Sequence, residues 1–269
     1  MNKQKVGIEM KKTFLEYDKA MLTVMVQADN PDRIKELIDK SLPEGADAFG
    51  MQIELMKEEF RNADTYKELF NYAEDKPIYV TNYRTVRDKG ESFSKNKGKT
   101  DEQLADELIE LAECGATLCD VMGDFFDIQP DELAVDETAI KKQMELIDKI
   151  HEKGAEVLMS SHVLKFTSAE KVLQIAREHK RRGADISKIV VGADSMSEQI
   201  ENIRIINMLK EELGIPFLFL SGGECRILRR IGGELGCCMY LCVHEHDDFS
   251  TDAQPILAKV KMIRDNFNG

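Results

Sequence analysis

The sequence predicts a single (β/α)8 TIM barrel, an α/β fold, and three observations support this prediction. Eight apolar segments of strand length recur along the chain, and nearly every one is followed by a charged segment with helical periodicity. The strands are apolar on both faces, as expected for parallel strands between a barrel interior and a ring of helices. A length of 269 residues suits one barrel. We therefore expect residues 1–269 to form one domain, with an N-terminal extension before the first strand.

The predicted strands are apolar runs bounded by polar or glycine-containing segments. They cover residues 21–26, 48–53, 78–83, 117–121, 157–162, 186–191, 217–220 and 237–243. A doubly wound sheet is the alternative arrangement, but it usually has fewer strands. The first strand is followed by Gln-Ala-Asp-Asn-Pro, not by a glycine-rich dinucleotide loop, which favours the barrel.

The predicted helices carry one apolar stripe each. They cover residues 31–41, 100–113, 137–153, 168–182, 195–213 and 251–266. Asn30 is a suitable cap for the first of them, and Thr100 with Gln103 has the spacing of a capping box. Three helices are followed directly by a glycine, where a left-handed residue is favourable: Gly154, Gly183 and Gly214.

Composition limits the classes of function. The net charge of −13 disfavours binding to nucleic acid or to anionic membranes, and no apolar segment reaches the length of a membrane span. The first 20 residues lack the apolar core of a signal peptide. The six cysteines lack Cys-x-x-Cys pairs and most lie in apolar runs, which indicates reduced core residues of a cytoplasmic protein.

Lys188 and His162 are the candidate catalytic residues. Lys188 lies in the apolar run Ile186-Ser187-Lys188-Ile189-Val190-Val191, where a charged ammonium is costly unless it is paired. A desolvated lysine can form a Schiff base with a ketone, and a histidine on the neighbouring strand can then move a proton at the adjacent carbon. The alternatives are a lysine at the strand mouth held by Asp185 or Asp194, and a structural histidine.

Arginines near the strand ends are candidates for binding an anionic substrate, because a guanidinium can grip a carboxylate with two hydrogen bonds. Arg84 ends the third strand and Arg230 follows the seventh, whereas Arg226 and Arg229 fit solvated helix positions. Ser221-Gly222-Gly223 is a weak phosphate-loop signal.

A metal site at His244 and His246 lacks a third ligand fixed by spacing, so we expect no metal. Two loops are candidate lids over the cavity of the barrel, residues 88–99 and 244–254.

Five segments together resemble type I 3-dehydroquinate dehydratases, in the correct order along nearly the whole chain. The segment around Lys188 resembles that family's Schiff-base segment, and the one ending in His162 resembles its catalytic-histidine segment. Residues 83–90 resemble its Phe-Arg…Lys-Glu-Gly-Gly motif, with Asp88 in place of the glutamate, and residues 230–234 resemble its Arg-(Leu/Ile)-Ala-Gly-Glu motif. Ser250 and Gln254 match the serine and glutamine of its closing loop.

The resemblance implies a lyase of the shikimate pathway, which supplies aromatic amino acid biosynthesis, that dehydrates 3-dehydroquinate to 3-dehydroshikimate. Lys188 would form the imine, and His162 would be the general acid and base. Arg230 would hold the substrate carboxylate, aided by Arg84, and Ser250 and Gln254 would close over it. The resemblance implies no metal or diffusible cofactor, and a homodimer.

The sequence departs from the family at its second, fourth and fifth strands. The family's Glu-Trp-Arg-x-Asp is replaced by Gly50-Met51-Gln52-Ile53-Glu54, so Gln52 and Glu54 are the remaining polar candidates there. The fourth strand keeps Asp120 but has Met122 where the family has glutamate, and Val163 follows the histidine. Gly50 and Met122 suggest a roomier and less polar cavity wall. Asp88, Asp120 and Ser221 are expected to support the site.

Three alternatives to 3-dehydroquinate dehydration remain open. The first is a relative of the family that uses Lys188 and His162 on a different carboxylated ketone. A lysine-dependent aldolase of phosphorylated sugars would use the loop at Ser221 for phosphate. A catalytically silent barrel that binds a small acid or a protein partner would leave Lys188 unreactive towards ketones.

Overall fold

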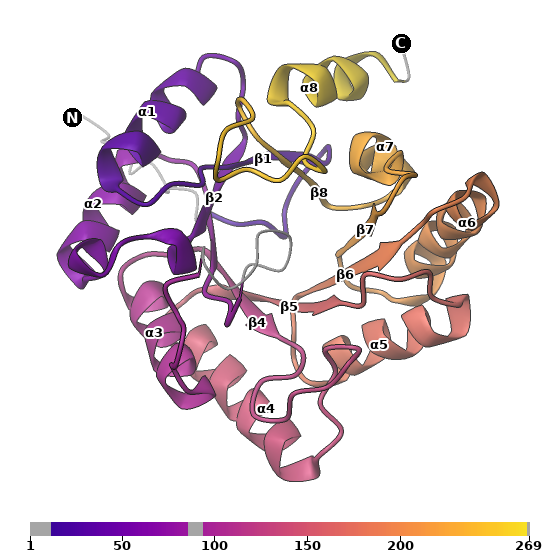
Figure 1. Ribbon diagram of the computed structural model, residues 1–269, viewed down its shortest axis with the longest axis horizontal. Coiled ribbons are helices and arrows are strands. Elements are labelled where there is room, and N and C mark those ends of the chain that lie inside the picture. Colours follow the sequence, from indigo (N-terminus) through magenta and orange to yellow (C-terminus); the bar gives the residue numbers. More distant parts are fainter. Residues whose placement is uncertain (1–11, 86–93, 268–269) are drawn as a thin grey trace, which may run out of the picture.

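The computed structural model describes residues 12–85 and 94–267, and it confirms the (β/α)8 barrel. Eight parallel strands alternate with eight α-helices in this part of the chain, and the helices surround the strands (Figure 1). The strands are β1 (Met21–Met25), β2 (Ala48–Gln52), β3 (Ile78–Thr81), β4 (Leu118–Met122), β5 (Glu156–His162), β6 (Ile186–Gly192), β7 (Phe217–Gly222) and β8 (Met239–Cys242).

The strands follow one another around the barrel in chain order. β8 pairs with β1 in parallel, and successive strands from β1 to β7 pair with their neighbours. Between β7 and β8, the amide of Cys238 donates to the carbonyl of Phe217 at 2.9 Å, which brings the two ends of the sheet together. The barrel is therefore nearly closed, and the carboxyl ends of all strands meet at one face.

The first six of the eight helices in the described part of the chain each begin at a residue whose side chain caps the helix. The helices are α1 (Pro31–Ser41), α2 (Ala63–Tyr72), α3 (Asp101–Glu113), α4 (Glu137–Glu152), α5 (Ala169–Arg181), α6 (Met196–Glu212), α7 (Leu228–Leu235) and α8 (Leu257–Asn266). The side chain of Asn30 caps α1, and Thr100 with Gln103 forms the predicted capping box of α3. The glycines after α4, α5 and α6 have positive φ, as expected for left-handed residues that end a helix.

Three elements differ from the prediction: α2 and α7 are helices that the sequence did not predict, and α8 is shorter than predicted. Residues 251–256 were expected in the last helix, but α8 begins at Leu257 because Val243 forms a parallel bridge with Ile256. The N-terminal extension is anchored to the barrel at Phe14, which is fully buried and whose amide donates to the Glu156 carboxylate at 2.8 Å, whereas residues 15–19 are exposed. The extension thus covers the barrel beside the first residue of β5.

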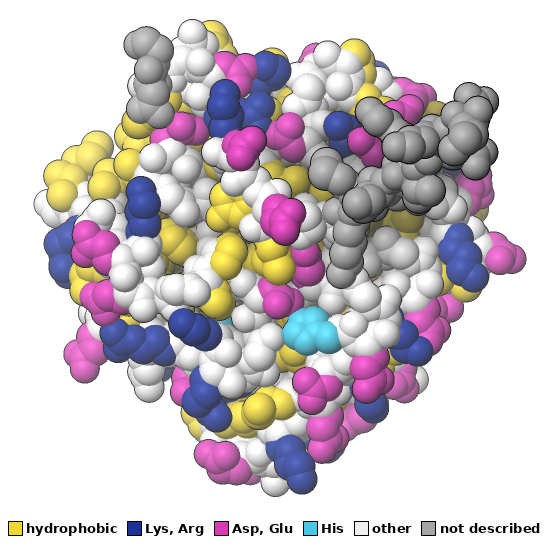
Figure 2. All heavy atoms as spheres, turned by 180° about the vertical axis from the view of Figure 1, so that it is seen from behind, with side chains coloured by type: hydrophobic (Ala, Val, Ile, Leu, Met, Phe, Trp, Pro, Cys, Tyr) yellow, Lys and Arg dark blue, Asp and Glu magenta, His cyan; other side chains and the backbone are white. Residues whose placement is uncertain are grey.

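The protein core lies inside the barrel and between the strands and helices. Five of the six cysteines are buried and all six are free thiols, as predicted, while Cys225 is half-buried. Within the described residues no helix combines the length and apolar character needed to cross a membrane. Acidic and basic side chains are interspersed over the face seen in Figure 2.

Candidate active site

A cavity of about 880 Å³ opens at the carboxyl ends of the strands. Its walls come from all parts of the barrel: Met25 from β1, Gln27 from the segment directly after β1, Gln52 from β2, His162 from β5 and Lys188 from β6 are among the lining residues. This is the face at which (β/α)8 barrels place their active sites. The volume is suited to a small molecule.

Lys188 lies at the bottom of this cavity, in contact with two tyrosines and a carboxylate. Its Nζ lies 2.7 Å from the Tyr83 hydroxyl, 3.1 Å from the Tyr79 hydroxyl and 3.2 Å from Oδ2 of Asp120. Lys188 is 4% exposed and Asp120 is 1% exposed, so the ion pair is buried. The apolar run around Lys188 therefore forms a central strand as predicted, and Asp120 supplies the partner that a buried ammonium requires.

His162 points into the same cavity and is held by Glu132. Oε2 of Glu132 lies 2.7 Å from Nδ1 of His162 and also accepts a hydrogen bond from the His162 amide at 2.6 Å. Glu132 is 4% exposed and adopts a left-handed conformation with φ of 47°. A carboxylate on Nδ1 fixes the orientation and tautomer of an imidazole, which places His162 for proton transfer through its other nitrogen.

Lys188 and His162 lie on the same side of neighbouring strands. Lys188 is in register with Ser160, and Ser160 donates to Asp120 inside the barrel at 2.6 Å. His162 is two residues further along β5, so its side chain is on the face that carries Ser160. The Tyr83 ring joins the two groups, because its hydroxyl contacts Lys188 and its ring meets the His162 ring edge-on at 5.3 Å between centroids.

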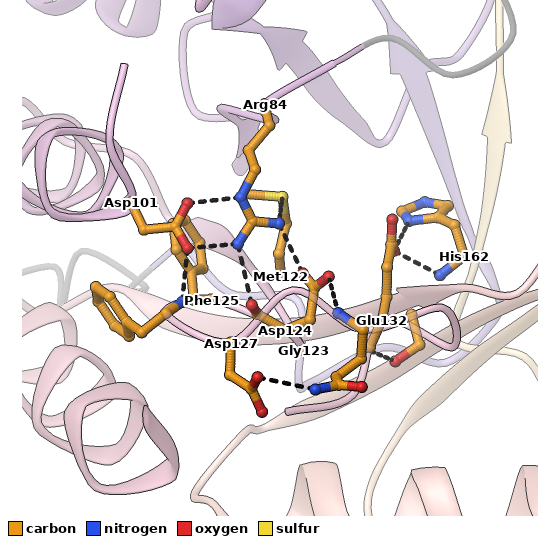
Figure 3. A network of polar contacts seen from close by, with 12 residues as sticks. Arg84, Asp101, Met122, Gly123, Asp124, Phe125, Asp127, Glu132 and His162 are labelled. Carbon is orange, nitrogen blue, oxygen red and sulfur yellow. Dashed lines mark hydrogen bonds and ion pairs between the residues drawn. The ribbon is translucent and has the colours of Figure 1, made fainter. Parts of the chain in front are cut away.

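A buried polar network holds the loop that carries Glu132. Arg182 donates to the carbonyls of Gly123 and Ala134, at the two ends of this loop, at 3.1 and 2.8 Å. The Ser161 hydroxyl donates to the Glu132 carbonyl at 2.6 Å and also contacts His179. Figure 3 shows the loop from Met122 through Asp124 to Glu132, with the Glu132 carboxylate turned towards His162. The strained backbone of Glu132 is thus held by Ser161 of β5 and by Arg182, which directly follows α5.

His179 should make the stability of this network depend on pH. Burial lowers the pKa of His179 to about 3, and the charge of Arg182 adds to the effect. The folded protein therefore keeps His179 neutral while the unfolded chain binds a proton below about pH 6.5. Stability should fall as the pH drops from 6.5 towards 3, by up to about 1.4 kcal/mol per unit from this group. Urea unfolding at several pH values measures this dependence, and His179→Gln should remove the contribution of His179 to it. Plots of unfolding free energy against pH that run parallel for wild type and variant would contradict the prediction.

The arginines are placed differently from the sequence prediction. Arg84 lines the cavity, but its guanidinium is engaged by Asp101 at 2.6 Å and by Asp124 at 2.8 Å (Figure 3). Burial raises the pKa of Asp124, against the opposing effect of Arg84. Burial acts to lower the pKa of Arg84, but the contacts with Asp101 and Asp124 outweigh it, so the pKa of Arg84 is raised. Arg230 is exposed and is not a lining residue, whereas Arg226 and Arg229 both line the cavity. The wall after β7 thus presents Arg229 where the sequence suggested Arg230.

The wall at β1 and β2 carries amides and a methionine. Gln27 donates to Gln52, which donates at 2.9 Å to Glu54. Gln27 and Gln52 line the cavity, but Glu54 is fully buried behind them, where burial raises its pKa. The expectation that Gly50 leaves extra room needs correction, because Met25 Sδ occupies the space where a Cβ would lie. This wall is less charged, as expected, but it is filled.

The remaining predicted site residues fall into two groups: those that line the cavity and those that lie behind its wall. Gln254 lines the cavity together with Thr251, to which its side chain is hydrogen-bonded. Ser250 and Ser221 are buried and are not lining residues; Ser250 caps the turn at Asp247, and Ser221 contacts Gln199.

Two further predictions concern the candidate lid loop that contains Asp88 and the presence of a metal site. Asp88, with the first part of the candidate lid, lies outside the described residues. Among the described side chains, no cluster of three His, Cys, Asp or Glu residues has the geometry of a metal site.

Three residues of the site are absent from the sequence prediction. Tyr79 and Tyr83 look like ordinary aromatic residues of an apolar strand, and only the barrel closure brings them to Lys188. Glu132 lies in a loop without periodicity, 30 residues from the histidine that it contacts. One sequence signal points to a replacement: Met122 lacks the carboxylate expected on β4, and the loop that follows is rich in acidic residues, among them Glu132.

Fold and site together define the class: a (β/α)8-barrel protein with a buried lysine and a carboxylate-held histidine in one cavity at the carboxyl face. The family model described as type I 3-dehydroquinase matches residues 22–259. The chain therefore belongs to the type I 3-dehydroquinase family, as the sequence resemblance predicted. No curated protein sequence matches the chain.

Solved structures support the same fold. The 3-dehydroquinate dehydratase from Geobacillus kaustophilus is similar with a TM-score of 0.78 at 15% identity, covering 95% of each chain. The type I 3-dehydroquinate dehydratase from Clostridium difficile, solved with covalently modified comenic acid, has a TM-score of 0.76 at 17% identity, covering 94% of each chain. The 3-dehydroquinate dehydratase from Aquifex aeolicus has a TM-score of 0.68 at 18% identity, covering 92% of this chain and 99% of that one.

Proposed function

We propose that the protein is a Schiff-base hydro-lyase that dehydrates 3-dehydroquinate to 3-dehydroshikimate. The observation that carries this proposal is the buried Lys188 amine on the floor of the cavity, with His162 on the same face of the adjoining strand. Membership of the type I 3-dehydroquinase family supports the reaction class. The reaction needs no group that the chain does not itself provide.

In the proposed mechanism, Nζ of Lys188 attacks the substrate ketone, and loss of water gives a protonated imine. The imine withdraws electrons and acidifies the neighbouring C–H. His162, held at Nδ1 by Glu132, takes this proton through Nε2 and then donates a proton to the departing hydroxyl. Hydrolysis of the product imine returns Lys188, and the Asp120 carboxylate is the counter-ion of the protonated imine as it is of the resting ammonium.

The substrate carboxylate is assigned to the wall after β7. Arg226 and Arg229 supply positive charge there, and Gln254 adds an amide from the loop after β8. Arg84 is a weaker candidate because Asp101 and Asp124 already neutralise its guanidinium. The geometry thus favours Arg229 over Arg230 as the carboxylate ligand.

This assignment predicts different effects for two neighbouring arginines. Arg229→Met should raise KM for a carboxylated substrate roughly 10- to 100-fold, since a hydrogen bond to a charged group contributes about 1.5–3 kcal/mol. Arg230→Met is the matched control and should leave KM within about twofold, because Arg230 is exposed outside the cavity. Steady-state kinetics of both variants test this. A larger effect at Arg230 would reverse the assignment.

A second candidate is a related reaction on a different carboxylated ketone. The observation that favours it is the wall at β1 and β2, where Met25 fills the space at Gly50 and the lining polar groups are the amides of Gln27 and Gln52. Buried polar groups that bind substrate hydroxyls control specificity strongly. A change from charged groups to amides should therefore alter which arrangement of substrate hydroxyls the cavity prefers. The ability of Lys188 to form an imine should be affected less.

Turnover assays separate these candidates. The purified protein is incubated with 3-dehydroquinate, and formation of the conjugated enone of 3-dehydroshikimate is followed by its ultraviolet absorbance. Turnover that is lost in Lys188→Met supports the proposed dehydratase. No turnover of 3-dehydroquinate, combined with borohydride trapping of another keto acid on Lys188, supports the second candidate. Failure of every keto acid to label the protein would contradict both and favour a barrel that only binds its ligand.

A further inference from the structure

We propose that Tyr83 is a catalytic residue that relays protons between Lys188 and the substrate oxygen while the imine forms and breaks. This inference rests on the proposed Schiff-base function and adds a residue to it. It addresses a step that His162 does not explain: a buried lysine that is paired with a carboxylate must lose a proton before its nitrogen can attack a ketone.

The hydrogen bonds around Lys188 form a directed path. Lys188 Nζ donates to the Tyr83 hydroxyl at 2.7 Å, and this hydroxyl donates in turn to Oδ2 of Asp120. Asp120 is 1% exposed and also accepts hydrogen bonds from Tyr79 and Ser160. The shortest contact of the ammonium is thus with a hydroxyl whose own proton already points at a carboxylate.

Tyr83 acts as a relay and not as a resting base. Burial raises the pKa of the Tyr83 hydroxyl well above 10, and the negative charge of Asp120 raises it further. The phenol therefore keeps its proton at neutral pH and transfers one only by receiving another at the same time. The carboxylate of Asp120 is the group that holds the proton between steps.

The protons balance over imine formation. Lys188 passes one proton through Tyr83 to Asp120 and attacks the carbonyl carbon, which forms the C–N bond. A second proton moves from nitrogen to the new alkoxide through the Tyr83 hydroxyl, giving a carbinolamine. The proton held by Asp120 then returns through Tyr83 to the carbinolamine hydroxyl, the C–O bond breaks, and water leaves. The result is a protonated imine paired with the Asp120 carboxylate, so the site keeps its net charge.

Position distinguishes Tyr83 from Tyr79. Tyr79 lies within β3 and is fully buried, and its hydroxyl is 3.1 Å from Lys188 Nζ. Tyr83 lies after the end of β3, is partly exposed, and packs edge-on against His162. Both tyrosines line the cavity and both hydroxyls donate to Asp120, but only Tyr83 also packs against His162, so Tyr83 lies between the two groups that act on the substrate. Tyr79→Phe is therefore the matched control for Tyr83→Phe.

The test measures the rate of imine formation directly. Wild type, Tyr83→Phe and Tyr79→Phe are mixed with 3-dehydroquinate, or with whichever keto acid labels the wild type, and are quenched with borohydride at increasing times. Intact mass then gives the fraction of protein carrying the reduced adduct. The Tyr83→Phe variant should form the adduct roughly 100-fold more slowly, a value typical of losing a proton-transfer group, and Tyr79→Phe less than about tenfold more slowly. The solvent deuterium isotope effect on this step should shrink in Tyr83→Phe.

The outcomes separate the relay from the function on which it rests. Adduct formation at the wild-type rate in Tyr83→Phe, or equal slowing in both variants, would overturn the relay while leaving the Schiff-base function intact. No adduct in the wild type with any keto acid would overturn both. Thermal unfolding of each variant checks that a slow rate does not reflect loss of folded protein, and Tyr83→Trp, which is bulky but lacks the hydroxyl, should be at least as slow as Tyr83→Phe.

Discussion

Lys188→Met is expected to abolish both turnover and borohydride trapping. The variant removes the only nitrogen that the proposed mechanism uses as a nucleophile, so the loss should exceed the roughly 10²- to 10⁴-fold typical of a proton-transfer residue. Methionine preserves the length and packing of the side chain. Asp120 keeps three hydroxyl donors, from Tyr79, Tyr83 and Ser160, so the variant is expected to fold. Intact mass after borohydride treatment, with circular dichroism as the folding check, measures the effect.

An exposed lysine provides the control for this variant. Lys141 is exposed on α4, outside the cavity, and Lys141→Met should retain wild-type trapping and turnover. Trapping that persists in Lys188→Met would show that another lysine is the nucleophile. The floor of the cavity would then hold a structural ion pair between Lys188 and Asp120, and the proposed chemistry would have no basis.

His162→Ala is expected to separate imine formation from the proton transfers that follow. The variant should lose roughly 10²- to 10⁴-fold in kcat, as for removal of a general acid and base. Borohydride should still trap the substrate on Lys188, because the nucleophile and the path through Tyr83 to Asp120 are unchanged. The trapped species should have the mass of the substrate adduct, one water heavier than that of the product adduct.

Glu132→Gln tests whether the carboxylate acts through the histidine. The amide keeps the size of the side chain and can accept from the His162 amide, but it cannot stabilise a positively charged imidazole as a carboxylate does. We expect a fall in kcat that is smaller than in His162→Ala, with little change in KM. Adding Glu132→Gln to His162→Ala should have almost no further effect on kcat, because the carboxylate acts through the ring. If the two substitutions lowered kcat independently, so that their effects multiplied in the double variant, the proposed action of Glu132 through His162 would be contradicted.

Most of the fold could be predicted because the barrel repeats one local pattern. Each strand is apolar on both faces and most helices begin at a cap that the sequence displays, as at Asn30 and Thr100. The short helix α7 was not predicted as a separate element because its sequence, Leu-Arg-Arg-Ile-Gly-Gly-Glu-Leu, contains two helix-disfavouring glycines and lacks a side-chain cap. It forms because Gly233 packs closely against Tyr240 and Ala20, a contact that only the closed barrel creates.

The site could be predicted only where a residue conflicts with its local surroundings. Lys188 is a charge within an apolar strand, and His162 ends a neighbouring strand, so both are visible in the sequence. Tyr79 and Glu132 are unremarkable in their own segments and gain their roles from contacts with distant strands. Motif similarity predicts Arg230, but Arg230 is exposed on α7 and its neighbour Arg229 lines the cavity.

The most direct test of this account is to locate the covalent adduct. The wild-type protein is incubated with 3-dehydroquinate, reduced with borohydride and digested, and the modified peptide is sequenced by tandem mass spectrometry. We predict a single modified residue, Lys188, in the segment from Gly183 to Gly192 that forms the strand beside His162. A reduced adduct on any other lysine, with Lys188 recovered unmodified, would contradict the central claim.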